Sequence, residues 1–413
     1  MKYGLIGEKL GHSFSKEIHE KLADYTYDIQ EIPPAELGDF MRKKAFSAIN
    51  VTIPYKQAVF PYLDEISEQA KTIGAVNTVV CKGNKLYGYN TDFFGMRALI
   101  LRAGIDLTDK TVMILGGGGT SRTARAVAED LKAKEVLVVS RSGKDGISYA
   151  EAKEIHSDAE IIINTTPCGM YPNIDELPPI DLADFPKVEG VVDAVYNPIR
   201  TQLVSMARER GIPAVGGLYM LVAQAAYAVE YFLDCKVPQE AIEQVFRELE
   251  SAKENIVLIG MPGCGKSTVG KRLAKKLNRR FLDTDALLTE YCGKTPNEII
   301  REQGEPAFRA LETKVILELV APLNGCVIAT GGGAILRDEN VRALKQNGRM
   351  VFLDRPLELL AVSDDRPLSS DRQLLEKRYH ERYDRYCATA DIKISAVKDP
   401  SILCEQIIEE LKQ

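Results

Sequence analysis

The sequence predicts an α/β protein built on parallel β-sheets, with helices packed against them. Short apolar runs alternate with helical stretches along almost the whole chain, which is the pattern of parallel strands joined by helical crossovers. The 413 residues correspond to two or three domains at roughly 150 residues per domain. Two apolar runs lead directly into glycine-rich loops, and a predicted helix follows each loop. Loops placed in this way bind phosphate groups in α/β folds.

Composition excludes several classes of partner. Hydrophobic residues make up 45% of the chain and charged residues 27%, as in ordinary globular proteins. The net charge of −6 gives no basic footprint for nucleic acid. No apolar run approaches the roughly 20 residues of a membrane span, and residues 1–7 read as a short buried strand rather than a signal peptide. We therefore expect small-molecule partners, with neither nucleic acid nor membrane among them.

Cysteine and histidine usage indicates a reducing compartment and no structural metal. The eight cysteines are scattered, without a CxxC pair, which suits reduced thiols in a cytoplasm. The four histidines show no metal-ligand spacing such as HExxH. The sequence therefore predicts a cytoplasmic protein.

The predicted strands fall into two series, separated by a polar segment. The first series is 48–52, 111–115, 136–140, 161–164 and 191–195, and the second is 256–259, 327–329 and 350–353. An amphipathic helix is predicted at 239–249, and the polar residues 250–254 after it are interpreted as a short linker. The linker lacks proline and glycine, so the two halves can abut rather than swing.

The second glycine loop is a phosphate cradle. Residues 260–267, GMPGCGKS, fit the pattern GxxxxGK[ST] in full, between a buried strand and a helix predicted at 268–277. Backbone N–H groups of such a loop surround phosphate oxygens, Lys266 reaches the β- and γ-phosphates, and Ser267 ligates Mg²⁺. The predicted ATP contacts are Gly263, Cys264, Gly265, Lys266, Ser267 and Thr268.

The same half of the chain carries candidates for an anionic acceptor site. Asp283 and Asp285 end a short strand after the loop, and a second glycine turn occupies 331–333. Arg309, Arg366 and Arg382 follow at helix starts and in a loop. A single arginine is usually surface charge, but arginines that converge on a phosphate loop suit a carboxylate, which a guanidinium binds through two hydrogen bonds.

With these motifs, residues 255–413 resemble shikimate kinases, which implies a P-loop domain like that of nucleoside monophosphate kinases. The resemblance implies that Asp283 helps to bind Mg²⁺ with Ser267, while Asp285 orients the acceptor hydroxyl. It implies that Arg309 and Arg382 grip the shikimate carboxylate, and that Gly331, Gly332 and Gly333 line the substrate. Lys266 and the lid residue Arg366 would stabilise the transferring phosphoryl group. The segment before Arg366 is short, so we expect a short lid.

The first glycine loop fits a dinucleotide site. The run 111–115 leads into GGGGTSR at 116–122 and a helix predicted at 123–131, as in a Rossmann unit. The next strand ends at Ser140 and Arg141, where an NAD enzyme usually has an acidic residue, so a 2′-phosphate and NADP are favoured. The alternatives are an ordinary tight turn and a solvated Arg141. The predicted NADP contacts are Gly116, Gly118, Gly119, Thr120, Ser121, Ser140, Arg141 and Gly217.

Seven further segments point to one family. They are GHSFS at 11–15, INVTIPYK at 49–56, GAVNT at 74–78, GYNTD at 88–92, NTTPCGM at 164–170, DAVYNP at 193–198 and GLYML at 217–221. Together they resemble shikimate dehydrogenases over residues 1–249. The resemblance implies a substrate domain at 1–92 and 218–249, a Rossmann NADP domain at 93–217, the linker at 250–254, and then the kinase domain at 255–413.

The resemblance also implies roles for individual residues. Ser13 and Ser15 would bind the substrate carboxylate, and Lys56 with Asp92 would form the catalytic pair. An ammonium group can stabilise the charge that builds on a ketone oxygen during hydride transfer and can supply the proton. The remaining implied substrate contacts are Thr52, Asn77, Tyr196 and Gln224.

The two resemblances imply consecutive reactions of chorismate and aromatic amino-acid biosynthesis. A dehydrogenase that uses NADPH would make shikimate from 3-dehydroshikimate, and a kinase that uses ATP and Mg²⁺ would phosphorylate it. One alternative is a quinate-active or divergent dehydrogenase fused to a kinase with another small-molecule acceptor. Another is a regulatory or binding module that keeps the folds without catalysis. The oligomeric state stays open.

Overall fold

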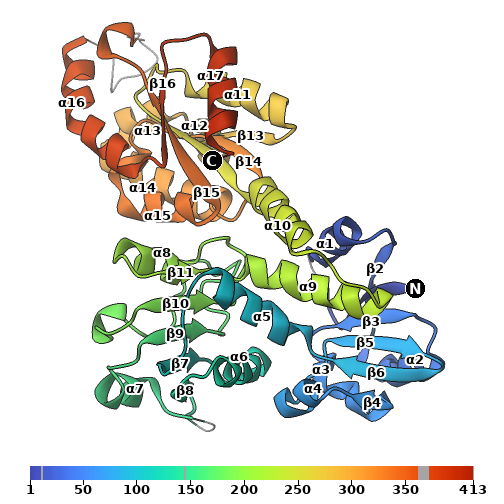
Figure 1. Cartoon of the computed structure of the whole chain (residues 1–413). Coiled ribbons are helices and arrows are strands. Elements are labelled where there is room, and N and C mark those ends of the chain that lie inside the picture. Colours follow the sequence, from blue (N-terminus) through green and yellow to red (C-terminus); the bar gives the residue numbers. More distant parts are fainter. Residues whose placement is uncertain (11–12, 144–145, 361–371, 413) are drawn as a thin grey trace. The chain divides into compact units, whose positions relative to one another are not determined.

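The computed structural model of the chain describes residues 1–10, 13–143, 146–360 and 372–412 (Figure 1). The chain divides into two compact units, Met1–Leu249 and Glu250–Gln413. The described strands form one six-stranded and two five-stranded sheets, with helices packed against them. The predicted α/β fold class is therefore confirmed.

The first sheet of the first unit has six strands in the order β2-β1-β3-β5-β6-β4. The strands are β1 (Tyr3–Gly7), β2 (Tyr27–Glu31), β3 (Ala48–Val51), β4 (Glu65–Ile66), β5 (Thr78–Lys82) and β6 (Lys85–Tyr89). β1 is parallel to β2 and β3, whereas β5 is antiparallel to β3 and β6. The accompanying helices are α1 (Ser15–Leu22), α2 (Leu37–Lys43), α3 (Tyr55–Ala58) and α4 (Glu68–Ile73).

The second sheet of this unit is parallel throughout, in the order β11-β10-β9-β7-β8. Its strands are β7 (Thr111–Leu115), β8 (Glu135–Val139), β9 (Ile161–Asn164), β10 (Gly190–Asp193) and β11 (Ala214–Val215). Helices α6 (Gly119–Asp130), α7 (Tyr149–Ile155) and α8 (Gln202–Glu209) connect them. The crossover helices of a parallel sheet cover both of its faces, so its strands are continuous apolar runs. Strands β7 and β9 have such sequences.

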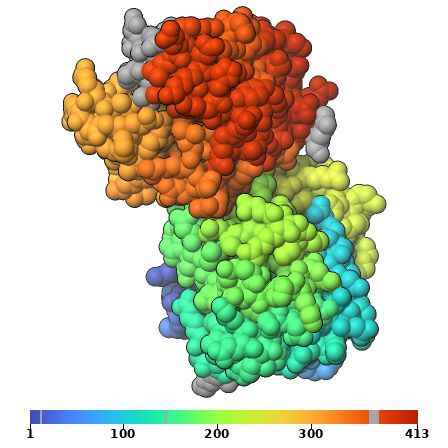
Figure 2. Space-filling view, turned by 90° about the vertical axis from the view of Figure 1, so that its left-hand side faces the viewer, coloured from blue at the N-terminus to red at the C-terminus, as the bar shows by residue number. Residues whose placement is uncertain are grey.

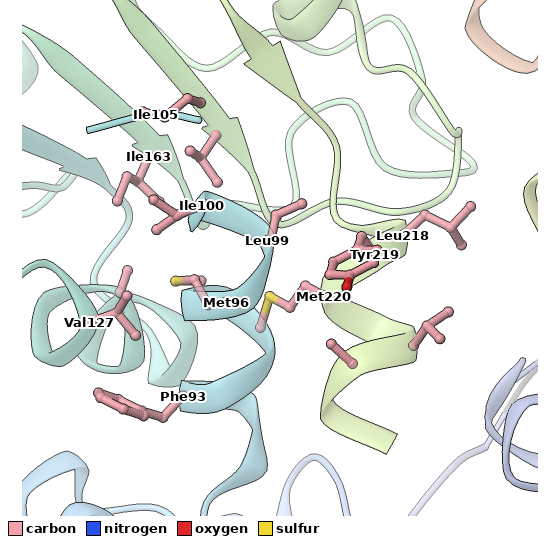
Figure 3. Packing of buried hydrophobic residues seen from close by; sticks show 14 of the residues in the cluster. Phe93, Met96, Leu99, Ile100, Ile105, Val127, Ile163, Leu218, Tyr219 and Met220 are labelled. Atoms are coloured by element: carbon pink, nitrogen blue, oxygen red, sulfur yellow. The ribbon is translucent and has the colours of Figure 1, made fainter. Parts of the chain in front are cut away.

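Helices α5 (Thr91–Arg102) and α9 (Leu218–Leu233) join the two sheets of the first unit. Of the sixteen residues of α9 only Glu230 is charged, as expected for a helix that is covered nearly all round. Met96, Leu99 and Ile100 of α5 lie between the side chains of α9 and those of the second sheet (Figure 3). This packing fixes the first turn of α5, which carries a candidate catalytic residue.

The second unit is built on a parallel sheet in the order β13-β14-β12-β15-β16. Its strands are β12 (Asn255–Ile259), β13 (Arg280–Asp283), β14 (Cys326–Ala329), β15 (Gly348–Asp354) and β16 (Ile392–Ser395). Its helices are α11 (Lys266–Leu277), α12 (Thr284–Cys292), α13 (Pro296–Gln303), α14 (Glu305–Val315), α15 (Asp338–Asn347), α16 (Arg372–Thr389) and α17 (Pro400–Glu410). The space-filling view shows the surface of the chain from another side, with the same colours along the sequence (Figure 2).

The predicted strands agree with the observed ones to within two residues at each end, and β7 and β9 coincide with their predictions. The predicted end of the helix before the linker is wrong. Helix α10 (Gln239–Lys253) continues four residues past its predicted end, so that most of 250–254 is helical. The reason is local: Ala252 and Lys253 favour helix, and no proline or glycine stops it.

No helix among the described residues is long and apolar enough to cross a membrane.

Candidate active sites

A pocket in the first unit is lined by residues of strands β1 and β3, of helices α1, α3, α5, α6 and α9, and of the loops next to β5 and β10. It brings together every substrate-binding and catalytic side chain predicted for this half: Ser13, Ser15, Thr52, Lys56, Asn77, Asp92, Tyr196 and Gln224. Thr120 and Gly217, which were predicted to contact the dinucleotide, line the same pocket. The candidate substrate and cofactor sites are therefore adjacent.

An ion pair between Lys56 and Asp92 lies in this pocket. Lys56 belongs to α3, directly after β3, and Asp92 belongs to the first turn of α5, which Asn90 caps. Nζ of Lys56 lies 2.6 Å from Oδ2 of Asp92, and the two side chains are 28% and 18% exposed. An ammonium held in this way can stabilise charge on a substrate oxygen and deliver a proton to it.

Hydroxyl groups supply further polar lining. Oγ of Ser13 donates to Oγ of Ser15 at 3.0 Å, and the backbone N–H of Ser15 donates to Oγ of Ser13 at 3.2 Å. Burial raises the pKa of Tyr196 above its ordinary value, so the phenol keeps its proton at neutral pH. These groups can donate hydrogen bonds to a carboxylate or a hydroxyl.

The first glycine loop begins where β7 ends. Gly116 has φ +110°, and a Cβ there would lie 2.8 Å from Oγ1 of Thr165, so only glycine fits. By contrast, a Cβ on Gly118 or Gly119 would meet nothing within 4 Å. The loop is therefore open beside the start of α6, where backbone N–H groups can receive a pyrophosphate. Ser121, by contrast, is buried.

The end of β8 presents Ser140 and Arg141, as predicted for a 2′-phosphate site. Ser140 lies beside the loop, because its Cβ would be 3.6 Å from a Cβ on Gly117. The side chain of Arg141 is 78% exposed, and its Nη2 lies 3.5 Å from Oε1 of Glu176. Sequence reasoning missed Glu176, which no local pattern connects with Arg141. This long contact leaves the guanidinium able to exchange its carboxylate for a phosphate.

The second unit holds a pocket around the second glycine loop. Gly260, Gly263 and Gly265 have φ values of +144°, +84° and +102°, which L side chains rarely adopt. Helix α11 begins at Lys266, whose Nζ donates to the carbonyls of Gly260 at 2.8 Å and Met261 at 3.1 Å. The ammonium is thus held above the loop, where a phosphate would replace the carbonyls as its partner.

Most of the predicted ATP contacts line this pocket. They are Gly263, Gly265, Lys266, Ser267 and Thr268. Cys264 is buried and is not part of the lining.

Two aspartates stand at the start of α12, next to the loop. Asp283 caps this helix, accepting from the backbone N–H of Asp285 at 3.1 Å, and its other oxygen accepts from Oγ of Ser267 at 2.7 Å. The hydroxyl and carboxylate are hard oxygen ligands that fit Mg²⁺. No group of three His, Cys, Asp or Glu that could hold a metal occurs in the described part of the chain. The ion would therefore depend on phosphate oxygens and water for its other ligands.

The predicted acceptor side chains converge beside the aspartates. Nη1 of Arg309 lies 2.6 Å from Oε2 of Glu312, and its Nη2 lies 3.0 Å from Oε1 of Glu305. Glu312 is buried, which raises the pKa of its carboxyl group, and Arg309 opposes that rise. The second oxygen of Glu312 has no hydrogen-bond partner among the described residues.

The glycine turn at 331–333 allows these groups to approach. A Cβ on Gly331 would lie 2.5 Å from Oε1 of Glu312, and one on Gly333 would lie 2.2 Å from Nη2 of Arg309. The carbonyl of Gly332 accepts from Nη1 of Arg382 at 3.2 Å and from the hydroxyl of Tyr386. The turn has no side chains because carboxylates and guanidinium groups occupy that space.

One arginine of this pocket was missed by sequence reasoning. Arg378 lines the pocket one helical turn before Arg382 on α16. Desolvation and the neighbouring charge of Arg382 lower the pKa of Arg378. Its spacing of four residues from Arg382 could have revealed it, because residues four apart share a helix face. The predicted lid residue Arg366 lies outside the described residues.

Three family models match parts of the chain. Residues 5–79 match the shikimate dehydrogenase substrate binding domain, and residues 217–245 match the shikimate 5'-dehydrogenase C-terminal domain. Residues 262–412 match shikimate kinase.

Known proteins resemble the first part of the chain. A shikimate dehydrogenase (NADP(+)) of Clostridium perfringens is 39% identical over 267 residues, which cover 60% of this chain and 98% of that relative. One from Methanosphaera stadtmanae is 33% identical, over 58% of this chain and 94% of that relative.

Solved structures resemble the same part. A chorismate mutase/shikimate 5-dehydrogenase fusion protein from Clostridium acetobutylicum is 37% identical, with a TM-score of 0.57 over 60% of this chain and 96% of that one. Shikimate 5-dehydrogenase from Thermus thermophilus, solved with NADP(H) and shikimate, is 27% identical, with a TM-score of 0.54 over 60% of this chain and 99% of that one.

Proposed function

Since the chain belongs to the shikimate dehydrogenase family and continues into a shikimate kinase domain, we propose that it catalyses two consecutive reactions. The first is the reduction of 3-dehydroshikimate to shikimate by NADPH. The second is the phosphorylation of shikimate by ATP to shikimate 3-phosphate. One chain would then carry an oxidoreductase and a phosphotransferase of aromatic amino-acid biosynthesis.

The observation that carries the proposal is that each of two pockets brings together most of the side chains predicted for its reaction. The pocket of the first unit has the Lys56–Asp92 pair next to an open dinucleotide loop. The pocket of the second unit has Lys266, two aspartates and three arginines around a glycine turn. A binding module would need neither set.

In the first pocket, NADPH when bound supplies the hydride. Lys56 would stabilise the charge that builds on the carbonyl oxygen and would donate the proton that completes the hydroxyl. Asp92, 2.6 Å from the ammonium, would hold Lys56 in position and keep it charged until transfer. Ser13 and Ser15 would bind the substrate carboxylate, and Tyr196 would donate a further hydrogen bond.

In the second pocket, Mg²⁺ when bound neutralises phosphate charge. Lys266 would release the carbonyls of its own loop and bind the β- and γ-phosphates. Asp285 would hold the acceptor hydroxyl in line with the phosphorus and accept its proton. Arg309 and Arg382 would hold the acceptor carboxylate, with Glu312 fixing the orientation of Arg309 through their 2.6 Å contact.

Assays of the purified chain test the proposal. NADPH oxidation should require 3-dehydroshikimate, and phosphorylated product should require shikimate with ATP and Mg²⁺. Faster reduction of 3-dehydroquinate would favour the quinate-active alternative. Phosphorylation of another small alcohol in preference to shikimate would favour a different kinase acceptor. A folded protein with no turnover of either kind would instead support a binding module.

A further inference from the structure

We propose that Thr78 and Asn50 are positioning residues that fix the direction of the Asn77 side-chain amide, so that Asn77 offers the substrate only hydrogen-bond donors. The inference deepens the proposed dehydrogenase function and rests on it. All three residues are buried, with Thr78 0%, Asn77 4% and Asn50 6% exposed.

A backbone group shows in which direction the Asn77 amide lies. The N–H of Thr91 lies 2.7 Å from Oδ1 of Asn77. A backbone N–H can only donate, so the atom that faces it must be oxygen. The hydroxyls of Thr78 and Thr91 lie 3.0 and 3.2 Å from the same oxygen. The nitrogen of Asn77 must therefore face the other way.

The amide of Asn50 is fixed by the opposite kind of backbone group. Its Nδ2 lies 3.2 Å from the carbonyl oxygen of Asn77, which can only accept. The same nitrogen donates to Oγ1 of Thr78 at 3.1 Å, and Oδ1 of Asn50 accepts from the hydroxyl of Tyr27 at 2.7 Å. The hydroxyl of Thr78 therefore accepts a hydrogen bond from Asn50 and donates one to Asn77.

These bonds form a chain with one direction, from Tyr27 through Asn50 and Thr78 to Oδ1 of Asn77. Nδ2 of Asn77 is not bonded to any of the described residues, although the side chain lines the pocket. The two N–H groups of this amide are thus available to donate to ligand oxygens. Chains of this kind strengthen one another in a buried, low-dielectric site.

The second amide of the pocket has the opposite polarity. Nε2 of Gln224 uses one of its two N–H groups to donate to the carbonyl of Leu221 at 3.0 Å, and Oε1 can accept from a ligand. That oxygen lies 3.4 Å from the hydroxyl of Thr91. The pocket therefore combines a donor amide at Asn77 with an acceptor amide at Gln224. A ligand with several hydroxyl groups fits this pattern in one orientation.

The test compares shikimate with analogues that each lack one of the ring hydroxyls that are not oxidised, by kcat/KM for oxidation with NADP+. Asn77→Ala identifies the hydroxyl bound by Asn77: in this variant, the analogue that lacks that hydroxyl should have the same kcat/KM as shikimate. Thr78→Val replaces the hydroxyl by a methyl group. It should lower the discrimination against that analogue, which is the ratio of kcat/KM for shikimate to kcat/KM for the analogue, about tenfold. It should raise the KM for shikimate and change kcat less than threefold. Thr78→Ser should restore discrimination.

Two comparisons separate positioning from loss of structure. The kinase activity of the same chain should be unchanged in Thr78→Val. Thr72→Val, at an exposed position of α4, should behave as wild type. Thr78→Ala serves in place of Thr78→Val if that variant does not fold. Equal losses for all analogues, or undiminished discrimination, would overturn the positioning role. A wild-type chain inactive on shikimate would instead refute the proposed dehydrogenase function.

Discussion

Lys56 and Asp92 are 36 residues apart in sequence, yet their charged atoms lie 2.6 Å apart in the pocket of the first unit. The contact depends on two helix starts, because α3 follows β3 directly and α5 begins at Thr91. The packing of α5 beneath α9 holds the second of these starts (Figure 3).

Replacing Lys56 by alanine should remove the proton donor and charge stabilisation in the reduction. We expect kcat to fall by about 10²- to 10⁴-fold, with a much smaller change in the KM for NADPH. Stopped-flow or steady-state absorbance of NADPH measures the effect. Lys71→Ala, which removes an exposed lysine of α4 paired with Glu68, is the matched control. A loss below tenfold would exclude Lys56 as the catalytic acid.

Arg141 should set the preference for NADPH over NADH. Arg141→Ala should raise the KM for NADPH about tenfold and leave that for NADH nearly unchanged, since only NADPH carries the 2′-phosphate. Glu176→Gln should lower the KM for NADPH, because it removes the competing carboxylate 3.5 Å away. The control is Arg125→Ala, an exposed arginine of α6 paired with Glu129. Equal effects on both cofactors would contradict this role.

Arg378 should increase the affinity of the kinase pocket for its anionic acceptor. Arg378→Leu should raise the KM for shikimate about five- to tenfold and leave the KM for ATP unchanged, because the side chain lines the pocket with Arg309 and Arg382. Lys377→Leu makes the same change of charge at an adjacent, exposed position, where the lysine side chain is 72% exposed. If both variants raised the KM for shikimate equally, the increase would come from the loss of a positive charge in general, and the predicted role of Arg378 in the pocket would be wrong.

His19 should make the first unit less stable as the pH falls. Burial lowers the pKa of His19 from 6.5 to about 3, partly opposed by Asn50. Below pH 6.5 the unfolded chain therefore binds a proton at this residue that the folded chain does not bind. The free energy of unfolding falls as the pH falls from 6.5 towards 3. The loss should reach about 2 kcal/mol at pH 5. It is measured by urea unfolding at pH 7.5 and pH 5.

His19→Phe should remove much of this pH dependence while keeping a ring stacked on Tyr27, whose centroid is 4.0 Å from that of His19. The phenol of Tyr25 loses its 2.7 Å partner, so the variant can be less stable at pH 7.5. The informative quantity is the difference between the two pH values. An equal difference in wild type and variant would show that other groups cause the loss.

The phosphate loop could be predicted from the sequence because its geometry is local. Eight consecutive residues, 260–267, specify the turn, the lysine and the helix start, and the structure forms them within one connection between β12 and α11. The strands β7 and β9 were predicted for a similar reason, since each is a continuous apolar run. The end of α10 was not predicted. The helix continues through 250–253 because no proline or glycine stops it there, and the polar residues alone did not reveal this.

The dehydrogenase site could be assembled only through resemblance to a family. Lys56, Asp92 and Gln224 come from distant segments, and no spacing in the sequence brings them together. The groups of this site that reasoning missed share this property. Asn50 and Thr78 meet through the pairing of β3 with β5, and Glu176 reaches Arg141 across loops. Such contacts exist only once the sheets have formed.

The most direct test is a single assay of the whole chain supplied with 3-dehydroshikimate, NADPH, ATP and Mg²⁺. Wild type should consume NADPH and form shikimate 3-phosphate in equal amounts. Lys266→Ala should consume NADPH at the wild-type rate but stop at shikimate, because the residue that binds the β- and γ-phosphates is gone. Lys56→Ala should form shikimate 3-phosphate only when shikimate is added. Loss of NADPH consumption in folded Lys266→Ala, or loss of the phosphorylation of added shikimate in folded Lys56→Ala, would contradict two independent sites in one chain.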